Sequence, residues 1–246
     1  MPDEELYQSI FKRRSVRKFD VAPLDEGTLA RIRSFLSATR PMFPDIRTEL
    51  RFLGPDDVKG MFKVTAPHYL AIYSEEKGSY AANAGFILQQ VDLFLSASGI
   101  GSCWQGGPRP VKKVPSPPGL EFIIMLAFGR PAEPVHRSGA AEFKREPLAE
   151  STDIEGMDDI LEPARLAPSG MNNQSWFFTG GDGIVHAHSA GSMVLDRMNR
   201  INVGIALCHM CLAALHAGKR VEFAIDRSPA AAPPKGFSYV ATMLIK

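Results

Sequence analysis

The chain has 246 residues, enough for one or two ordinary domains with a large core, and its 28 basic and 27 acidic residues give no basic field for nucleic acid. Its apolar runs are too short to cross a bilayer, and the first 20 residues lack the apolar stretch of a signal peptide. Three cysteines favour reduced thiols, so we expect a cytoplasmic protein that binds neither membranes nor nucleic acids.

A basic cluster follows the first predicted helix, which covers residues 4–11. Guanidinium groups with a serine hydroxyl between them are suited to holding a phosphate. A basic run near a terminus is more often a solvated surface. Here Val16 interrupts the cations and Phe19 follows them, which indicates packing against the fold and slightly favours the phosphate site. The cluster consists of Lys12, Arg13, Arg14, Ser15, Arg17 and Lys18.

The first half continues with alternating helical and strand-like patterns. Asp25 opens an amphipathic helix that ends near Arg40, and strand-like runs follow at residues 50–53 and 69–73. A further strand is predicted at residues 122–128, followed by a polar, basic stretch.

The longest helical pattern covers residues 81–98 and is apolar on most sides, so we expect it at the centre of the core. It stops at Gly99 and Gly101, which flank Ile100. A glycine helix cap would explain the first glycine but not the second. The pair therefore predicts a turn, continuing into Ser102, where a ligand can approach bare backbone N–H groups.

The second half repeats this series of patterns. An amphipathic helix opens at Asp153, an apolar strand-like run covers residues 176–178, a long apolar helix ends at Gly218, and a strand covers residues 239–245. The order matches that of the first half, which raises the question of an internal repeat.

A polar loop, APSGMNNQSW, lies at residues 167–176 between the helix and the strand of this second half. Pro168 and Gly170 end the helix. Asn172 and Gln174 carry side-chain amides that donate and accept hydrogen bonds, and in an extended backbone they would lie on one side. Such a pair suits a planar heterocycle or a hydroxylated chain. The commoner alternative is that the amides only cap local backbone groups.

Two other groups of side chains could suggest a metal. Cys208 and Cys211 lie inside a helical pattern without a second ligand pair, so we interpret them as buried small residues. His186 and His188 alternate along a predicted strand, where a histidine pair is more often on the surface than a ligand. We therefore predict no metal site.

A repeated motif supports an internal duplication. Asn-Ala-Gly at residues 83–85 recurs as Asn-Val-Gly at 202–204, and each stands fourteen positions before its terminating glycine, Gly99 or Gly218. Two such copies would pack about a pseudo-twofold axis, as a single-chain pseudo-dimer. The boundaries would be a first repeat at 1–131, a basic linker at 132–152 and a second repeat at 153–246.

Four stretches together resemble the FMN-dependent nitroreductase family over nearly the whole chain: RRSVRKF, SGIGSCW, FGRP with a later Lys-Arg pair, and APSGMNNQSW. In that family, a homodimer builds two FMN sites at its interface. Here the first repeat has ATRPMFPD in place of the amide loop, and the second has Ala217-Gly218-Lys219 in place of the glycine turn. The resemblance therefore implies one surviving FMN site in a nitroreductase-like fold of the α+β class, as in a single-chain, duplicated branch. We expect a monomer or a weak homodimer.

The resemblance also implies a role for each motif. Arg13 and Ser15 would hold the FMN phosphate with Arg14 in the same cluster, assisted by Lys144 and Arg145. Arg17 would face the pyrimidine edge of the flavin. The remaining contacts would come from the amide loop and from the glycine turn near flavin N5: Pro168, Ser169, Gly170, Asn172, Gln174, Ile100, Gly101 and Ser102.

The implied reaction moves a hydride from NADH or NADPH onto FMN and then onto a quinone, nitroaromatic or similar acceptor. The flavin carries the chemistry, so no side chain is assigned as a catalytic acid or base. Two alternatives remain open. One is a non-catalytic flavin-binding or ligand-sensing protein with this fold, and the other is a flavin-free structural descendant.

Overall fold

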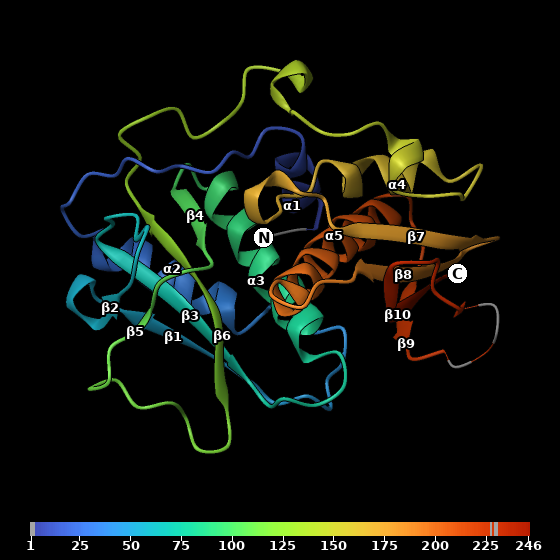
Figure 1. Ribbon diagram of the computed structural model, residues 1–246. Coiled ribbons are helices and arrows are strands. Elements are labelled where there is room, and N and C mark those ends of the chain that lie inside the picture. The colour runs from blue at the N-terminus through green and yellow to red at the C-terminus, as the bar shows by residue number, and fades with distance from the viewer. Residues whose placement is uncertain (1–2, 227, 229–230) are drawn as a thin grey trace.

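Two four-stranded antiparallel sheets stand on either side of a central helix pair, α3 (Tyr80–Ala97) and α5 (Asp196–His216) (Figure 1). The computed structural model describes residues 3–226, 228 and 231–246. The first sheet has the order β1-β3-β6-β4, with β1 Thr48–Leu53, β3 His68–Ser74, β4 Gly101–Gln105 and β6 Glu121–Gly129. The second has the order β7-β8-β10-β9, with β7 Trp176–Gly181, β8 Ile184–Ala190, β9 Val221–Ala224 and β10 Phe237–Ile245. A small ribbon pairs β2 Val58–Lys59 with β5 Arg109–Pro110.

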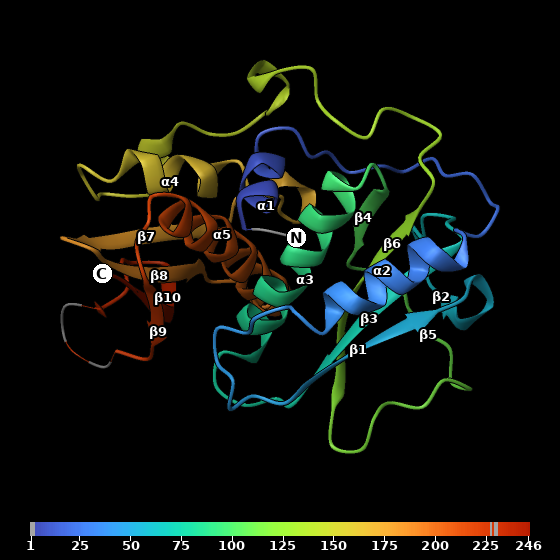
Figure 2. The ribbon, with the colours of Figure 1, turned by 180° about the vertical axis from the view of Figure 1, so that it is seen from behind.

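The other helices cover this frame. Seen from behind, α1 lies against both central helices and α2 lies in front of the first sheet, while α4 packs against α5 (Figure 2). Their bounds are α1 Asp3–Ile10, α2 Glu26–Leu36 and α4 Asp158–Arg165. Four short 3-10 turns complete the described elements: η1 Pro55–Asp57, η2 Ala140–Glu142, η3 Leu148–Glu150 and η4 Gly170–Asn172.

The two central helices form the core because they are apolar nearly all round. Every residue of α3 from Ala81 to Ser96 is buried, which confirms the central position predicted for this helix. By length and composition alone α5 could cross a membrane, but 78% of its most apolar 18-residue window is buried within the fold. Its apolar character is therefore accounted for by the core.

The central helices touch through two glycines. A side-chain carbon built onto Gly85 would lie 2.3 Å from the carbonyl oxygen of Ile201, and one built onto Gly204 would lie 1.9 Å from that of Ala82. Each contact involves a backbone oxygen three positions before the opposite glycine, so the two contacts mirror each other. Only glycine allows the helix backbones to approach this closely.

The elements recur in the same order in both halves. Apart from α1, the small ribbon of β2 and β5 and the 3-10 turns, the first half runs α2, β1, β3, α3, β4, β6, and the second runs α4, β7, β8, α5, β9, β10. The corresponding strands also occupy corresponding places in the two sheets. The antiparallel sheets and surrounding helices agree with the predicted α+β class.

Several predicted boundaries were wrong. The second helix ends at Leu36, not near Arg40, because Gln90 of α3 holds the segment that follows: its amide accepts from Arg40 N (3.0 Å) and donates to Arg40 O (2.7 Å). The helix expected from Asp153 begins only at Asp158, since Thr152 bridges to the second sheet. The residues after Gly101 form β4 instead of a bare loop, because they pair with β6.

The strand histidines are buried, so their interpretation as surface residues was wrong. His186 Nδ1 lies 2.9 Å from the Thr242 hydroxyl, and His188 Nε2 lies 2.9 Å from the Thr179 hydroxyl. Burial, followed by the charge of His186, lowers the pKa of His188 to about 4. Threonine partners allow these rings to face the interior. Cys208 is buried on α5, as predicted, but Cys211, for which burial was also predicted, is only half-buried.

Candidate functional site

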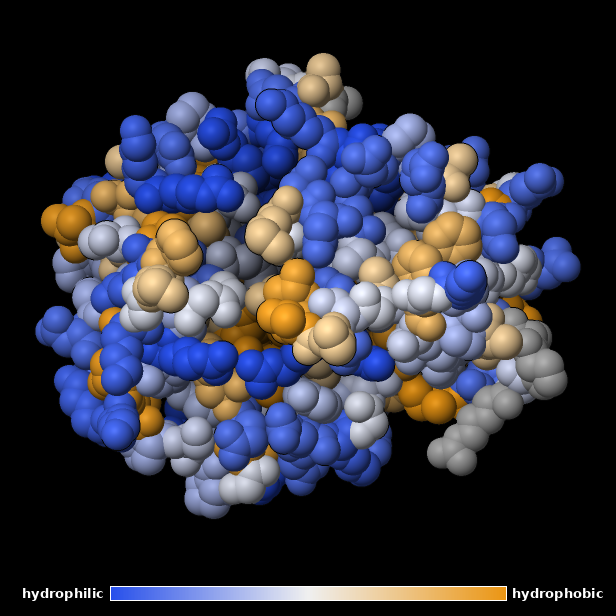
Figure 3. All heavy atoms as spheres, in the orientation of Figure 1, coloured by the Kyte–Doolittle hydropathy of each residue, from blue (hydrophilic) through white to orange (hydrophobic). Residues whose placement is uncertain are grey.

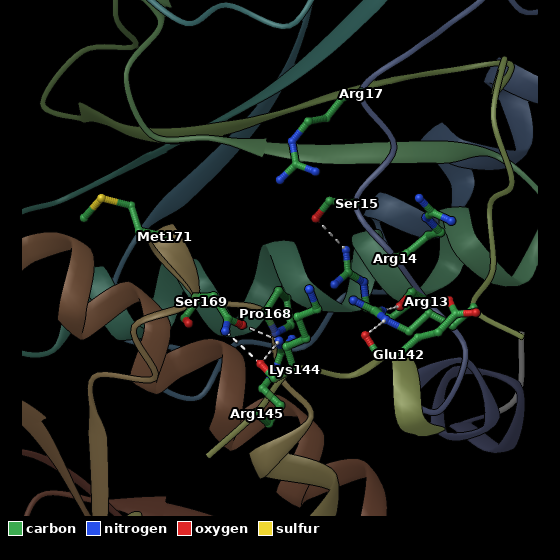
Figure 4. A pocket seen from close by; sticks show the side chains of 12 residues that line it. Arg13, Arg14, Ser15, Arg17, Glu142, Lys144, Arg145, Pro168, Ser169 and Met171 are labelled. Carbon is green, nitrogen blue, oxygen red and sulfur yellow. Dashed lines mark hydrogen bonds between the residues drawn. The ribbon is translucent and has the colours of Figure 1, made fainter. Parts of the chain in front are cut away.

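A cavity of about 660 Å³ opens where the N-terminal segment, the linker and the amide loop meet (Figure 4). The N-terminal segment runs antiparallel to the linker, with bridges from Arg13 to His136 and from Phe19 to Pro131. This pairing brings the two predicted basic groups together. The cavity is lined by six cations and one carboxylate: Arg13, Arg14, Arg17, Arg137, Lys144, Arg145 and Glu142.

Arg13 is the most constrained of these cations. Its side chain is 1% exposed, and its Nε lies 3.0 Å from Oδ2 of Asp92, which is fully buried on α3. The other carboxylate oxygen accepts a 2.5 Å hydrogen bond from the Ser102 hydroxyl. Arg13 also donates to the Ser15 hydroxyl at 3.2 Å. One buried carboxylate thus fixes both the basic cluster and the start of β4.

Sequence reasoning missed Asp92, although a signal was present. It is the only charged residue between positions 80 and 97, a stretch otherwise made of apolar, amide and small side chains. A lone carboxylate in a buried helix requires a charged or hydrogen-bonding partner. The basic cluster at residues 12–18 could have supplied this partner.

The residues of the glycine turn support the site from beneath. A side-chain carbon on Gly101 would lie 2.8 Å from Val16, and Val16 N donates to Ser102 O at 2.9 Å. Ile100 N is occupied by Leu95 O at 2.8 Å. This close packing explains the second glycine. Ile100, Gly101 and Ser102 line neither the basic cavity nor the apolar cavity that adjoins it. The next residue, Cys103, lines the apolar one.

The amide loop is a tight turn and not an extended segment. Met171, Asn172 and Gln174 have φ angles of 53°, 59° and 45°, so their side chains do not alternate. The Asn172 amide donates to Lys144 O at 2.8 Å, and the Gln174 amide accepts from Glu146 N at 3.0 Å. The expectation that both amides share one open side was therefore wrong. In this structure they fasten the loop to the linker.

Arg145 reinforces the same junction. It donates to Ala167 O at 3.1 Å and to Leu166 O at 3.2 Å, at the carboxyl end of α4, and it also binds the Asn172 side chain. Burial and then repulsion from Arg137 lower the pKa of Arg145 to about 10. Most of its hydrogen-bonding capacity is already used, so it positions the loop more than it offers a free anion site.

The cavity retains positive charge that the described residues do not neutralise. Among the described residues, the side chains of Arg14, Arg17 and Lys144 have no partner in an ion pair or hydrogen bond. Arg137 stacks over Phe143 at 4.0 Å, and burial, then repulsion from Arg13 and Arg14, lowers its pKa to about 10. An anion placed among these groups would relieve their repulsion.

A second, apolar cavity of about 550 Å³ adjoins the basic one. The two share Ser15, Arg17, Pro168, Ser169 and Met171. In Figure 3 apolar side chains appear near the centre of this face, below a hydrophilic upper margin. The main apolar wall consists of Trp104, Ile124, Leu195, Met198, Ile201 and Ile205.

Asn202 of α5 holds the loop over this apolar cavity. Its Oδ1 accepts from Gly170 N at 3.1 Å, and its Nδ2 donates to the Ser175 hydroxyl at 2.9 Å. Ser175 is buried and bound to Asn202, so the asparagine holds the end of the loop as well as its start.

The site suits a molecule with an anionic group at one end and a flat apolar group at the other. Of the predicted residues, Arg13, Arg14, Ser15, Arg17, Lys144, Arg145, Pro168, Ser169 and Asn172 line the basic cavity, and Gly170 lines the apolar one. Gln174 lines neither.

Comparison with known proteins identifies the fold and family. A family model described as "Putative TM nitroreductase" matches residues 5–214. The structure is similar to a protein from Thermotoga maritima described as a "putative nitroreductase", with 20% identity over 98% of this chain and 92% of that chain and a TM-score of 0.65.

Two further similar structures come from Clostridium difficile. A nitroreductase family protein of strain 630 has 16% identity, covers 59% of this chain and 94% of that chain, and gives a TM-score of 0.48. An FMN-dependent nitroreductase of strain R20291 has 16% identity, covers 59% of this chain and 100% of that chain, and gives a TM-score of 0.43. No curated protein matches the chain. The match of the family model over most of the sequence, on a shared fold, shows that this chain belongs to the nitroreductase family.

Proposed function

We propose that the protein is an FMN-dependent oxidoreductase of the nitroreductase type. The observation that carries this proposal is that a cavity with three cations unpaired among the described residues is continuous with an apolar one. FMN has this polarity, with a phosphate at one end and a planar ring system at the other. When bound, it would supply the exchange of a hydride between NADH or NADPH and a quinone, nitroaromatic or similar acceptor.

The protein residues would bind and orient the cofactor. Arg14 and Lys144 would contact the phosphate because their charges have no partner among the described residues. Arg13 would contribute charge while Asp92 keeps it in place. Arg17, which lines both cavities, would favour negative charge near the ring system. No side-chain acid or base is assigned to the transfer.

We infer further that the halves are diverged repeats that form a pseudo-dimer with one complete flavin site. Support comes from the matching order of elements and the mirrored glycine contacts. A cytoplasmic location fits this proposal, since the three cysteines are free and two of them are buried. A monomer or weak homodimer fits it as well, since the two halves would already pair within one chain.

The direct test is a flavin titration of the apoprotein, followed by turnover. We expect saturation at one FMN per chain, bleaching of the flavin spectrum by NADH or NADPH, and steady oxidation of NAD(P)H with menadione. Saturation at two per chain would refute the single site. Bound flavin without NAD(P)H turnover would identify the non-catalytic alternative, and absence of flavin binding would overturn the proposal.

A further inference from the structure

A third cavity, of about 390 Å³, lies on α5 away from the candidate flavin site. It is enclosed by residues 40–42, α3, α5 and β9. Its lining is Arg40, Pro41, Met42, Phe86, Gln90, Cys208, Cys211, Leu212, Leu215, Val221, Glu222 and Phe223. None of these residues lines the cavities described above.

The position of this cavity mirrors that of the apolar flavin cavity. Gly204 follows Gly85 by 119 positions, and the same interval relates three pairs of lining residues. Phe86, Glu222 and Phe223 line the third cavity, and their counterparts Ile205, Cys103 and Trp104 line the apolar one. The third cavity therefore lies at the equivalent place on the opposite side of the helix pair.

The loops over the two cavities are held in the same way. Asn83 Oδ1 accepts from Met42 N at 2.8 Å and from Phe43 N at 3.1 Å. Asn202, 119 positions later, accepts from Gly170 N at 3.1 Å. Each asparagine thus fixes the loop that covers its own cavity, so the third cavity has a built rim.

The charges of the third cavity are already paired. Arg40 binds Asp3 with 2.5 Å between Nη2 and Oδ1, and Glu222 binds Lys246 at 2.6 Å. Its one buried amide, Gln90, uses both ends of its side chain on Arg40 and Phe86. The cavity consequently offers an anion no cation comparable to Arg14 or Lys144.

The remaining wall is apolar and rich in sulfur. Phe86 and Phe223 meet edge to face, with ring centroids 5.2 Å apart. Met42 and the thiols of Cys208 and Cys211 face the same space. Aromatic rings pack favourably on aromatic edges and on sulfur. Cys211 also takes the place that Asp92 has in α3, 119 positions earlier, so the carboxylate that would fix an arginine is missing.

We propose that this cavity is a second small-molecule site, specific for a neutral, flat, aromatic molecule without a phosphate. Its volume lies within the range of ligand pockets. It is built on the same helix pair as the apolar flavin cavity and is covered by the equivalent loop of the first half, at residues 40–43, and its lining selects an uncharged occupant.

The test uses N-phenyl-1-naphthylamine, a neutral fluorescent aromatic, with the protein as purified. We expect saturable binding at one site that excess inorganic phosphate does not displace. Bound probe should slow iodoacetamide labelling of Cys211, the partly exposed thiol of this cavity, while Cys103, which lies outside it, serves as the buried reference in the same mass spectrum. Absence of saturation, or unchanged Cys211 labelling at saturation, would overturn the proposal.

Two variants locate the probe. Leu215→Trp should fill the third cavity and weaken probe binding at least tenfold, whereas Met198→Trp, in the apolar flavin cavity, should leave binding within twofold. The reverse result would place the probe in the flavin cavity and refute the assignment. Self-association that shields Cys211 without probe would show that a second copy, not a small molecule, occupies the cavity. The labelling of the unaltered chain decides the matter even if a variant fails to fold.

Discussion

The two loops that cover the central helix pair differ in chemistry although they are held alike. Asn202 holds the loop at residues 168–175 and Asn83 holds the loop at 40–43. The first loop borders six cations, and the second borders thiols and apolar side chains. The comparison teaches that one backbone frame can carry unlike sites, because a few side chains decide which ligand is stable there.

The largest expected effect comes from removing the buried charge that distinguishes the first loop's site. Asp92→Asn leaves Arg13 buried without its counter-ion, which should lower the free energy of unfolding by about 3–5 kcal/mol. Urea unfolding at neutral pH measures the change. Asp20→Asn is the matched control, because the Asp20–Arg130 pair is exposed and should contribute less than about 1 kcal/mol. Equal, small losses would mean that Arg13 reaches water in the variant.

The shared frame is tested at the helix crossing. Gly204→Ala places a carbon against the backbone of Ala82, so the helices must separate, at a cost of about 3 kcal/mol. Gly85→Ala should have a comparable effect from the other side. Thermal or urea unfolding measures both. Gly139, which has no atom within 4 Å of an added side-chain carbon, gives the control substitution to Ala. A mild effect at only one crossing glycine would show that the two contacts are not equivalent.

The basic cavity can be tested by affinity. Arg14→Ala removes a cation without a described partner, so FMN should bind about ten- to a hundredfold more weakly, which corresponds to roughly 1.5–3 kcal/mol. Riboflavin, which has no phosphate, should be almost unaffected. Lys18→Ala is the control for general electrostatics, since this exposed cation lines none of the three cavities. Identical losses for FMN and riboflavin would assign Arg14 a structural role instead.

The smallest effect concerns acid stability. His209 of α5 corresponds to Gln90 of α3, and each binds a backbone carbonyl, Pro163 O at 2.8 Å and Arg40 O at 2.7 Å. Burial lowers the pKa of His209 to about 3 from an ordinary value of 6.5. Its neutral form is therefore favoured in the folded state. Its contribution to the free energy of unfolding is complete above pH 6.5 and is lost as the pH falls towards 3.

His209→Gln should remove this part of the acid sensitivity, about 1.4 kcal/mol for each pH unit below 6.5. Unfolding free energies of the variant and the unaltered chain, compared at pH 7 and pH 5, measure the difference. His188, whose pKa is also lowered, stays in both proteins and leaves a residual slope. An unchanged slope in the variant would show that His209 is not protonated on unfolding in this range.

Sequence reasoning located the central helices and the basic cluster because these signals are local. Residues 81–98 are apolar on most sides, and the cations at 12–18 are adjacent in the chain. The pairing of the basic cluster with residues 144 and 145 came from the family resemblance, and the structure brings these residues to one cavity. The repeated Asn-x-Gly motif marked the two positions at which the helices meet.

The tertiary structure alone decided what each polar side chain contacts. Asn172 and Gln174 turn to the linker because a tight turn breaks the alternation expected of a strand. His186 and His188 are interior, where a threonine of a neighbouring strand lies within hydrogen-bond distance of one ring nitrogen of each. The use of a hydrogen bond or a charge depends on partners distant in sequence, whereas apolar periodicity depends only on the residues of one helix. Sequence by itself therefore determined where the two central helices and the cations lie along the chain, and folding determined which of those cations remain available to an anion.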